Sequence, residues 1–199
     1  MLRRYVPLLV LLALAGCLAP GVPLPPKAGP PPSPEDRLDV EALARETFRL
    51  VNRERVAAGI APLVWSDTLA RIAEVHSADM ARRRYFAHET PEGQSVNDRA
   101  ARFEATCRYT EGRTTWTGFA ENLAYEGAYS GIEFRTDPNG RRSERYLWRT
   151  GTDMAAAATR GWMNSPGHRA NILQRRSRRS GLAVARGDDH RMYFTQVFC

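Results

Sequence analysis

Two long segments of the chain carry apolar residues at the three-to-four-residue spacing of an amphipathic helix. The first covers residues 40–58 and ends at Gly59, because glycine readily adopts the backbone conformation that terminates a helix. The second begins after Ser66 or Asp67, either of which can cap it, and continues to about Arg84. Its apolar stripe comprises Leu69, Ile72, Ala73, His76 and Met80. A histidine on such a stripe, His76, is expected to be a hydrogen-bonded packing residue.

Shorter patterns follow in the remainder of the chain. They predict a short helix capped by Ser95 and ending near Phe103, a strand over residues 117–126, a hairpin over residues 134–148, a helix over residues 152–164, and two strands over residues 181–185 and 191–198. The turn between the last two strands contains His190, which is expected to be exposed. Helices that precede a terminal antiparallel hairpin indicate a layered α+β domain.

The N-terminus has the layout of a secretory signal. Two arginines precede an apolar run that is too short to span a bilayer. The run ends in residues 14–17, whose sequence LAGC resembles the lipobox of bacterial lipoproteins. Residues 1–16 are therefore predicted to be a lipoprotein signal peptide, with Cys17 as the lipid-bearing first residue that holds the mature protein to a membrane. The alternative is an ordinary signal peptide followed by an incidental cysteine.

A proline-rich tether separates this segment from the domain. Residues 17–34 begin with the cysteine and contain eight prolines, a composition that favours extended conformations and cannot bury a core. At about 3.1 Å per residue, the tether could hold a domain up to roughly 50 Å from the membrane. Residues 35–199 have a globular composition, and their number fits one domain.

Charge and cysteine content limit the possible partners. The formal net charge is +7, and the arginines are scattered among acids except for a cluster over residues 175–179. We expect this cluster to be solvated or to face anionic lipid or a phosphate-rich polymer, and we predict no nucleic-acid partner. Apart from Cys17, the chain has Cys107 and Cys199, which suggest one disulfide in an oxidising compartment. Two free thiols are the alternative.

Four blocks of sequence resemble the CAP superfamily, which comprises cysteine-rich secretory proteins, antigen 5 and plant pathogenesis-related proteins of group one. In the family's order, the blocks are VNRER with PLVW (51–55 and 62–65), HSADM with YFAH (76–80 and 85–88), AENLA (120–124), and WMNSPGHRANIL (162–173) echoed by YFTQVF (193–198). The resemblance is to the bacterial branch and runs from about residue 40 to the end of the chain. It implies an α-β-α sandwich in which a small antiparallel sheet lies between helical layers, with an open cleft.

The resemblance also implies a set of cleft residues. In eukaryotic members, two histidines and two glutamates line the cleft, and His88 and Glu121 match one of each. The other two positions depart from that pattern, because Ser165 and Tyr193 stand there in this sequence. His168, in the fourth block, is the expected second imidazole. The remaining residues expected on the cleft wall are Ser165, Tyr193 and Gln196.

These residues allow more than one kind of chemistry. His88, Glu121 and His168 could hold a divalent metal such as zinc, with further coordination positions left for water. The histidines could instead act as acids and bases near neutral pH. A third interpretation is a polar network that only joins elements of the fold. The sequence contains no GxSxG elbow and no HExxH motif, so it lacks these signatures of a hydrolytic enzyme.

Two functions are compatible with these observations. The first is an exported, lipid-anchored, non-enzymatic binding module that faces the periplasm or the exterior from the cell membrane or outer membrane. Its ligand would be a lipid or other hydrophobic molecule, or an envelope polymer, with a metal as a conceivable cofactor. The alternative is a hydrolase that acts on peptide or cell-wall material through the His/Glu cleft.

An insertion between the third and fourth blocks is a further candidate element. Residues 126–151 contain alternating aromatic residues and arginines. We hypothesise that this segment forms a flap over the cleft, and the alternative is a hairpin packed on the domain.

Overall fold

The computed structural model describes residues 38–199. The predicted signal peptide, Cys17 and the tether of residues 17–34 lie outside the described residues. Within residues 38–199, no helix combines the length and the apolar character needed to cross a membrane.

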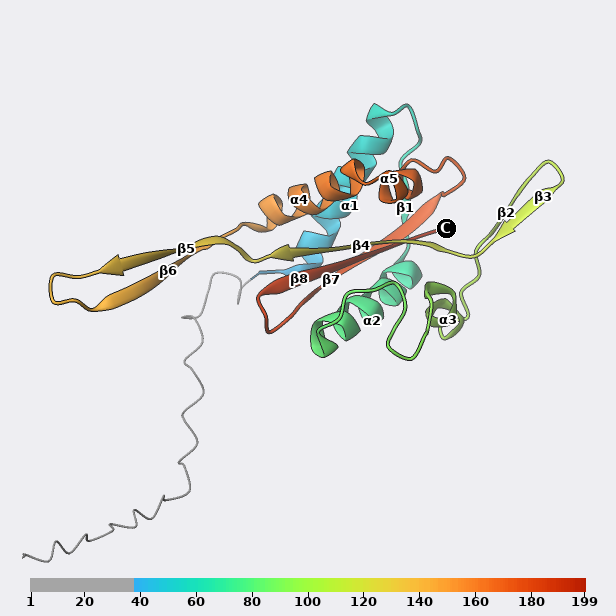
Figure 1. The fold of residues 1–199 in the computed structure, drawn as a ribbon. Helices are drawn as coiled ribbons and strands as arrows, with labels where there is room; N and C mark the ends of the chain where they lie inside the picture. The colour runs from blue at the N-terminus through green and yellow to red at the C-terminus, as the bar shows by residue number, and fades with distance from the viewer. Residues whose placement is uncertain (1–37) are drawn as a thin grey trace, which may run out of the picture. The chain divides into compact units, whose positions relative to one another are not determined.

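A four-stranded sheet forms the middle of the domain (Figure 1). Its strands, in spatial order, are β1 (Val64–Trp65), β7 (Arg179–Arg186), β8 (Arg191–Phe198) and β4 (Ala120–Gly127). The last three pair in antiparallel fashion, whereas the two residues of β1 pair parallel to β7. The predicted antiparallel sheet is therefore present, with one short parallel strand added at its edge.

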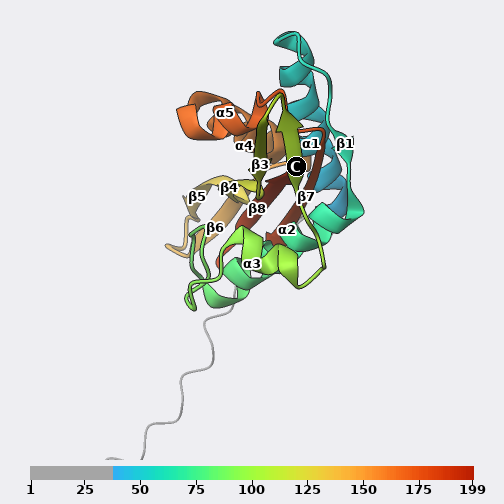
Figure 2. The ribbon, with the colours of Figure 1, turned by 90° about the vertical axis from the view of Figure 1, so that its right-hand side faces the viewer.

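Helices cover both faces of this sheet, which confirms the predicted α-β-α sandwich (Figures 1 and 2). One face carries α2 (Asp67–Arg83) and α3 (Val96–Ala101), and the other carries α1 (Val40–Ala57), α4 (Gly151–Asn164) and α5 (Pro166–Ile172). The two long predicted helices and the predicted caps at Ser66 and Ser95 are confirmed. The helix predicted over residues 152–164 begins one residue earlier, because Thr150 forms a capping box with Asp153.

Alternating side chains along β7 and β8 build a core on each face of the sheet. Leu182 and Phe194 belong to the cluster that packs against α1 and α4, whereas Ala183 and Val197 pack against α2. Helix α2 approaches the sheet very closely at Gly181. A Cβ atom on this residue would lie 2.0 Å from the backbone nitrogen of Ala70 in α2, so only glycine fits there.

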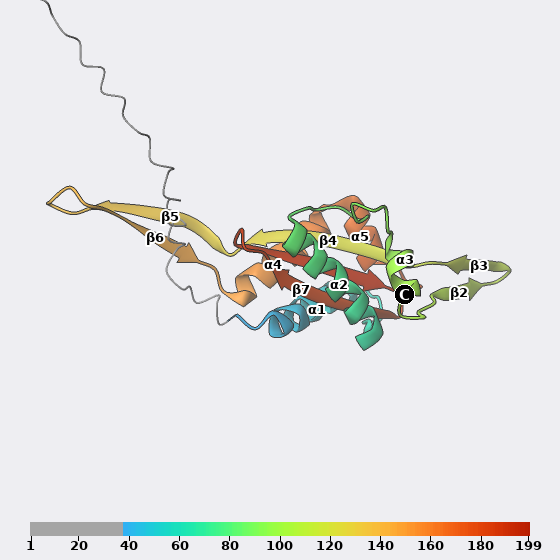
Figure 3. The ribbon, with the colours of Figure 1, turned by 90° about the horizontal axis from the view of Figure 1, so that it is seen from below.

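Two hairpins extend from the domain (Figures 1 and 3). The first, β2 (Arg108–Glu111) with β3 (Thr114–Thr117), was not predicted from the sequence pattern. The second, β5 (Tyr129–Thr136) with β6 (Arg142–Trp148), confirms the predicted hairpin and begins five residues before the expected start. It continues from the end of β4 that lies away from α3, and it projects beyond the sheet.

The base of this second hairpin contains a cluster of aromatic rings. The Tyr146 and Trp148 rings are stacked 5.3 Å apart, and the His190 ring lies 6.0 Å from that of Tyr129. His190 is therefore half-buried, in contrast to the exposed position predicted for it. The turn that carries it is covered by the hairpin, which the local sequence pattern did not reveal.

A disulfide bond joins Cys107 to Cys199, as predicted. Their Cα atoms are 5.5 Å apart and the two residues are separated by 92 positions in the sequence. The bridge fastens the segment before β2 to the end of β8. It therefore links the side of the sheet covered by α2 and α3 to the central strand.

Candidate functional site

The buried carboxylate of Glu121 is the centre of the candidate site. Glu121 lies near the start of β4, and its side chain is only 3% exposed. One carboxylate oxygen, Oε1, lies 2.9 Å from Nδ1 of His88, and the other accepts a hydrogen bond from the Arg99 guanidinium. The side chain of His88 is 58% exposed. The site therefore joins a buried ion pair to an imidazole at the surface.

Arg99, on α3, holds this arrangement together. Its buried guanidinium donates two further hydrogen bonds of 3.0 Å, to the backbone carbonyls of His88 and Gln94. One side chain thus fixes both the carboxylate and the loop that carries the imidazole. The capping box of Ser95 and Asp98 sets the start of α3 and so positions Arg99. Removing one partner of such a pair would leave an uncompensated buried charge.

The contact with Glu121 determines which nitrogen of His88 is available to a ligand. An ionised carboxylate can only accept hydrogen bonds, so Nδ1 carries the proton and donates it to Oε1. Nε2 is then the unprotonated nitrogen, on a ring that solvent reaches. Such a nitrogen can accept a hydrogen bond, bind a cation or take up a proton from a neighbouring molecule.

His76 lies behind this pair and is fully buried, in agreement with the packing role predicted for it. Its Nε2 lies 2.9 Å from the carbonyl of Ala87 and 4.0 Å from Oε1 of Glu121. Burial lowers its pKa, and although Glu121 raises it, the net shift is downward. The imidazole is therefore neutral at neutral pH and donates from Nε2 to the Ala87 carbonyl.

The second predicted imidazole, His168, lies on α5 beside β4. Burial lowers its pKa, and electrostatic repulsion from His88 lowers it further. The backbone carbonyl of His168 accepts a 3.1 Å hydrogen bond from the buried Asn122 side chain. Asn171 donates to Asn122 at 2.9 Å and to the Glu121 carbonyl at 3.3 Å. These bonds fix α5 against the strand that carries Glu121.

In this arrangement Glu121, one of the three residues predicted to hold a metal ion, is engaged by other protein groups. Both carboxylate oxygens of Glu121 are already engaged, one with His88 and one with Arg99. Among residues 38–199, no group of three or more histidine, cysteine, aspartate or glutamate side chains is placed to hold an ion. Glu121 instead orients the imidazole, a role that carboxylates commonly have beside histidines.

The structure does not bring all of the predicted cleft-wall residues to Glu121. Ser165 is the residue that precedes α5, and its side chain makes no capping hydrogen bond. Tyr193 is buried, and its hydroxyl donates to Asp189 at the far end of β8. Gln196 is also buried, and it donates to Ser180 on the face of the sheet opposite to Glu121.

Residues that sequence reasoning missed are needed to build the site. Arg99 carried no local signal, because an arginine in a short amphipathic helix is usually solvated. Asn122 and Asn171 stand inside the family-like blocks of residues 120–124 and 162–173, so their position was the available signal. Their role became visible only when β4 and α5 were seen side by side.

An exposed aromatic pair is carried by the same two segments as His88 and Glu121. Phe86 and Tyr125 are 44% and 48% exposed, and their ring centroids are 4.9 Å apart in an edge-on arrangement. Phe86 precedes His88 by two residues, and Tyr125 shares a face of β4 with Glu121. The Arg191 guanidinium lies 5.0 Å from the Tyr125 ring. The segments that carry His88 and Glu121 therefore also expose apolar surface.

Comparison with protein families and curated sequences gives a consistent picture. Residues 48–198 match the model of the CAP family, described as the cysteine-rich secretory protein family. An uncharacterized membrane protein of Bacillus subtilis (strain 168), YlbC, is 29% identical over 154 residues, which make up 77% of this chain and 33% of the relative. The chain thus spans about a third of the length of this relative.

Solved structures share the fold. An extracellular protein containing an SCP domain from Bacillus anthracis superposes with a TM-score of 0.59 at 23% identity, over 86% of this chain and 44% of that one. An outer surface protein from Borrelia burgdorferi superposes with a TM-score of 0.57 at 16% identity, over 81% of this chain and 94% of that one. At these identities the likeness supports the architecture alone.

Proposed function

The chain belongs to the cysteine-rich secretory protein (CAP) family, and on this basis we propose that it is an exported, non-enzymatic binding module of the cell envelope. The observation that carries the proposal is the exposed imidazole of His88, held in one tautomer by the buried Glu121–Arg99 pair. The free Nε2 offers an acceptor to a ligand. The exposed pair Phe86 and Tyr125, on the segments that carry His88 and Glu121, offers apolar contact to a ligand that extends along β4. A lipid or another envelope component with a polar group and an apolar part matches this surface.

The site favours binding over catalysis. Among the described residues, no serine, threonine or cysteine side chain is hydrogen bonded to His88, so the imidazole is not paired with a side-chain nucleophile. The carboxylate that orients it is also bonded to Arg99 and is therefore committed to the fold. A rigid group that presents one acceptor at the surface is suited to positioning a ligand.

The ligand can be identified by an unbiased search. The full chain, purified from envelope preparations, would be extracted and its bound molecules identified by mass spectrometry. We expect an envelope lipid or polymer fragment in the wild type and at least a tenfold lower amount in His88→Ala. Phe134→Ala, an exposed change on the distant hairpin, should leave the amount unchanged. Equal amounts in all three proteins would contradict binding at His88.

We further propose that Cys17 is fatty-acylated and anchors the domain to a membrane through the proline-rich tether. The support is the LAGC sequence after a short apolar run. Labelled fatty acid should enter the wild type and not Cys17→Ser, which should leave the membrane fraction or accumulate as a precursor. A wild type that takes up no label would refute the anchor without bearing on the His88 site.

One observation favours a hydrolase as a second candidate. An imidazole oriented by a carboxylate can act as a general base toward a water molecule held by the ligand. Saturable hydrolysis of a peptidoglycan fragment or peptide by the wild type, absent in His88→Ala, would establish this function. Ligand retention without turnover would instead support the binding module.

A further inference from the structure

One edge of the central sheet is open along most of its length. β7 is paired with β8 over Ser180–Arg186, but on its other side β1 reaches only Arg179 and Ser180. After Trp65 the chain turns into α2 and leaves the sheet. Within residues 38–199, no strand therefore lies beside Leu182 and Val184 on that side.

The backbone groups of Leu182 and Val184 point toward this open edge. On the β8 side, Arg179 exchanges two backbone hydrogen bonds with Cys199, and the N–H of Gly187, just after β7, donates to the carbonyl of Arg191. On the other side, the carbonyl of Ser180 accepts from the N–H of Ser66, the residue that follows β1. Successive residues of a strand alternate between its two neighbours, and the β7–β8 register has no shift. Odd-numbered residues thus face β8, and Leu182 and Val184 face outward.

These outward groups have no partner in the described part of the chain. No hydrogen bond beyond the β7–β8 ladder is made by the N–H or C=O of Leu182 or Val184. Leu182 is 1% exposed and Val184 is 7% exposed. Buried backbone donors and acceptors are almost always paired in folded proteins, so this pair of residues calls for a partner.

The opposite edge of the sheet is closed. Outward carbonyls of β4 accept side-chain hydrogen bonds, Glu121 from Asn171 at 3.3 Å, Leu123 from Trp162 at 2.8 Å and Gly127 from Arg149 at 3.1 Å. Side chains thus block addition of another strand at β4, a common protection of sheet edges. Within the described domain, the fold applies no such protection to β7.

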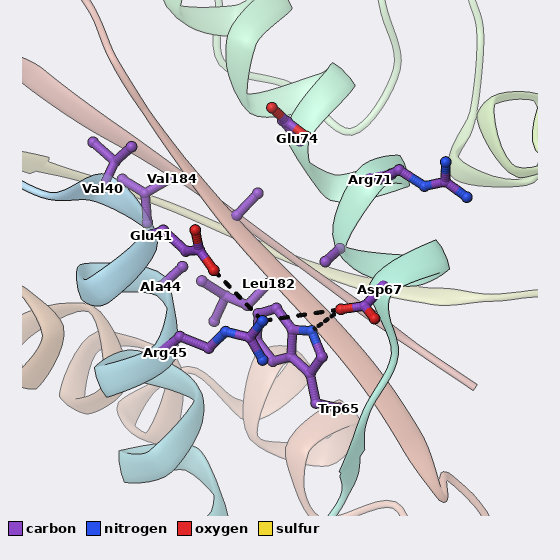
Figure 4. Close-up of a pocket in the computed structure, with 12 residues that line it drawn as sticks. Val40, Glu41, Ala44, Arg45, Trp65, Asp67, Arg71, Glu74, Leu182 and Val184 are labelled. Atoms are coloured by element: carbon purple, nitrogen blue, oxygen red, sulfur yellow. Dashed lines mark hydrogen bonds and ion pairs between the residues drawn. The ribbon is translucent and has the colours of Figure 1, made fainter.

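A groove of about 250 Å³ lies over the open edge of β7 (Figure 4). Its walls are α1 and α2, which contribute the small residues Ala44 and Ala70. Trp65 closes the end nearest β1, because its ring lies 3.8 Å beneath the Arg45 guanidinium and its indole nitrogen donates to Asp67 at 2.8 Å. The groove therefore continues the line of β1.

We propose that this groove binds an extended segment of a partner polypeptide, which adds to the sheet as a strand beside β7. An extended backbone presents N–H and C=O groups at the two-residue spacing that Leu182 and Val184 require. Its side chains would alternate between the two helical walls, where Ala44 and Ala70 leave room. Because the outward groups belong to only two residues, Leu182 and Val184, the paired part of the segment is short.

Two other occupants are less suited to the groove. The chain's own residues 17–34 contain eight prolines, which lack the N–H that a pairing strand must donate. A second folded copy would have to bring its own β7 edge, which is recessed between its own α1 and α2. An unfolded or loop segment of another protein meets neither obstacle.

Amide hydrogen exchange on the full-length protein tests the open edge directly. In the free protein, we expect the amides of Leu182 and Val184 to exchange at least tenfold faster than those of Ala183 and Ala185, which pair with β8. Equal protection of all four amides would overturn the proposal, because it would mean that the edge is already covered. Protection that depends on protein concentration would assign the groove to a second copy and would also overturn it.

A defined probe tests strand addition. The capped peptide acetyl-Thr-Val-Thr-Val-Thr-amide, at about 1 mM, should slow exchange at Leu182 and Val184 at least threefold, whereas the same peptide with alternate nitrogens methylated should have no effect. Ala70→Met, which fills the groove, should abolish the response. Ala78→Met, an exposed change on the same helix outside the groove, should preserve it. No slowing by the unmethylated peptide, or equal slowing in Ala70→Met, would overturn the proposal.

Discussion

Arg99 is the residue on which the candidate site depends most. Substituting methionine would leave Glu121 buried without its cationic partner, which costs about 3–5 kcal/mol in comparable pairs. We therefore expect Arg99→Met to lower the free energy of unfolding in urea by that amount. The double variant with Glu121→Gln should recover part of the loss, because the uncompensated charge is gone. His88→Ala, at an exposed ring, should change stability by less than about 1 kcal/mol.

An equal loss of unfolding free energy in Arg99→Met and His88→Ala would contradict this expectation. It would mean that the buried pair contributes no more to folding than the surface imidazole does. The urea midpoints and slopes of the three proteins, measured in one buffer, decide the question.

His76 should make stability depend on pH. Its pKa is lowered mainly by burial, although the neighbouring Glu121 raises it, while Arg99 and His88 add repulsion. In the unfolded chain the pKa returns to about 6.5. Below that pH the unfolded chain takes up a proton that the folded protein does not, so the free energy of unfolding falls as the pH drops. The slope for this one group is at most about 1.4 kcal/mol per pH unit.

The measurement compares urea unfolding at pH 7 and pH 5.5, where most carboxylates remain ionised. His76→Gln should show a weaker dependence than the wild type. His168 contributes with the same sign, because its pKa is also lowered, and His168→Gln reports its share. A wild type whose stability is constant or rises toward pH 5.5 would refute the expectation.

Individual residues show what the sequence could and could not reveal at this scale. His76 was assigned correctly to packing because it stood on an apolar stripe with helical spacing. His88 and Glu121 were paired through a family resemblance, and the structure places them in contact. Arg99 could not be identified in the same way, since its importance arises from a contact with a residue 22 positions away.

At the scale of elements, the contact between α2 and β7 depends on Gly181. An alanine there would place its Cβ within 2.6 Å of three backbone atoms of Leu69 and Ala70, and a helix backbone cannot yield locally. Because α2 must then move off the sheet, we expect Gly181→Ala to lower the free energy of unfolding by at least 2 kcal/mol, or roughly the range seen for overpacked cores. Thermal or urea unfolding measures it.

Gly161 provides a matched control for this change. It lies in α4, with nothing within 4 Å of an added Cβ atom. Gly161→Ala should stabilise the protein by about 0.5–1 kcal/mol, since alanine is the better helix former. If both substitutions had the same effect, the close approach at Gly181 would not be the cause.

The β5–β6 hairpin was hypothesised to be a flap over the cleft, and the structure places it elsewhere. Glu121 pairs with Val197, whereas the hairpin follows Gly127 at the other end of β4. Replacing residues 133–145 by Asn-Gly should therefore leave both the fold and ligand retention at His88 unchanged. Circular dichroism and the mass-spectrometric ligand assay test the two parts. Loss of ligand with an intact fold would restore the flap hypothesis.

The sequence pattern predicts some helices and strands better than others. The helices α1, α2 and α4 were predictable because each carries an apolar face and a recognisable start. The β2–β3 hairpin was not, because its residues are largely exposed and show no alternation between buried and solvent-facing positions. The two-residue β1 is too short for any periodic pattern, and only its neighbour β7 makes it a strand.

At the scale of the whole molecule, the Cys107–Cys199 bridge closes a long loop. A loop with a separation of 92 residues corresponds to about 4–5 kcal/mol in the chain-entropy description. Replacing both cysteines by serine should therefore lower the free energy of unfolding by up to that amount, and dithiothreitol should lower it equally in the wild type. The double variant should not respond to the reductant. A wild type that is insensitive to reductant would contradict the expected contribution.

The position of β8 in the chain has a consequence for how the protein can be delivered. This strand lies between β7 and β4 and is built from residues 191–198, so the sheet cannot close before those residues are free to join it. A chain threaded N-terminus first through a narrow channel would thus stay open until residues 191–198 had passed. The polypeptide would therefore remain unfolded during transport. Insertion of β8 into the sheet, followed by formation of the disulfide, would take place after transport.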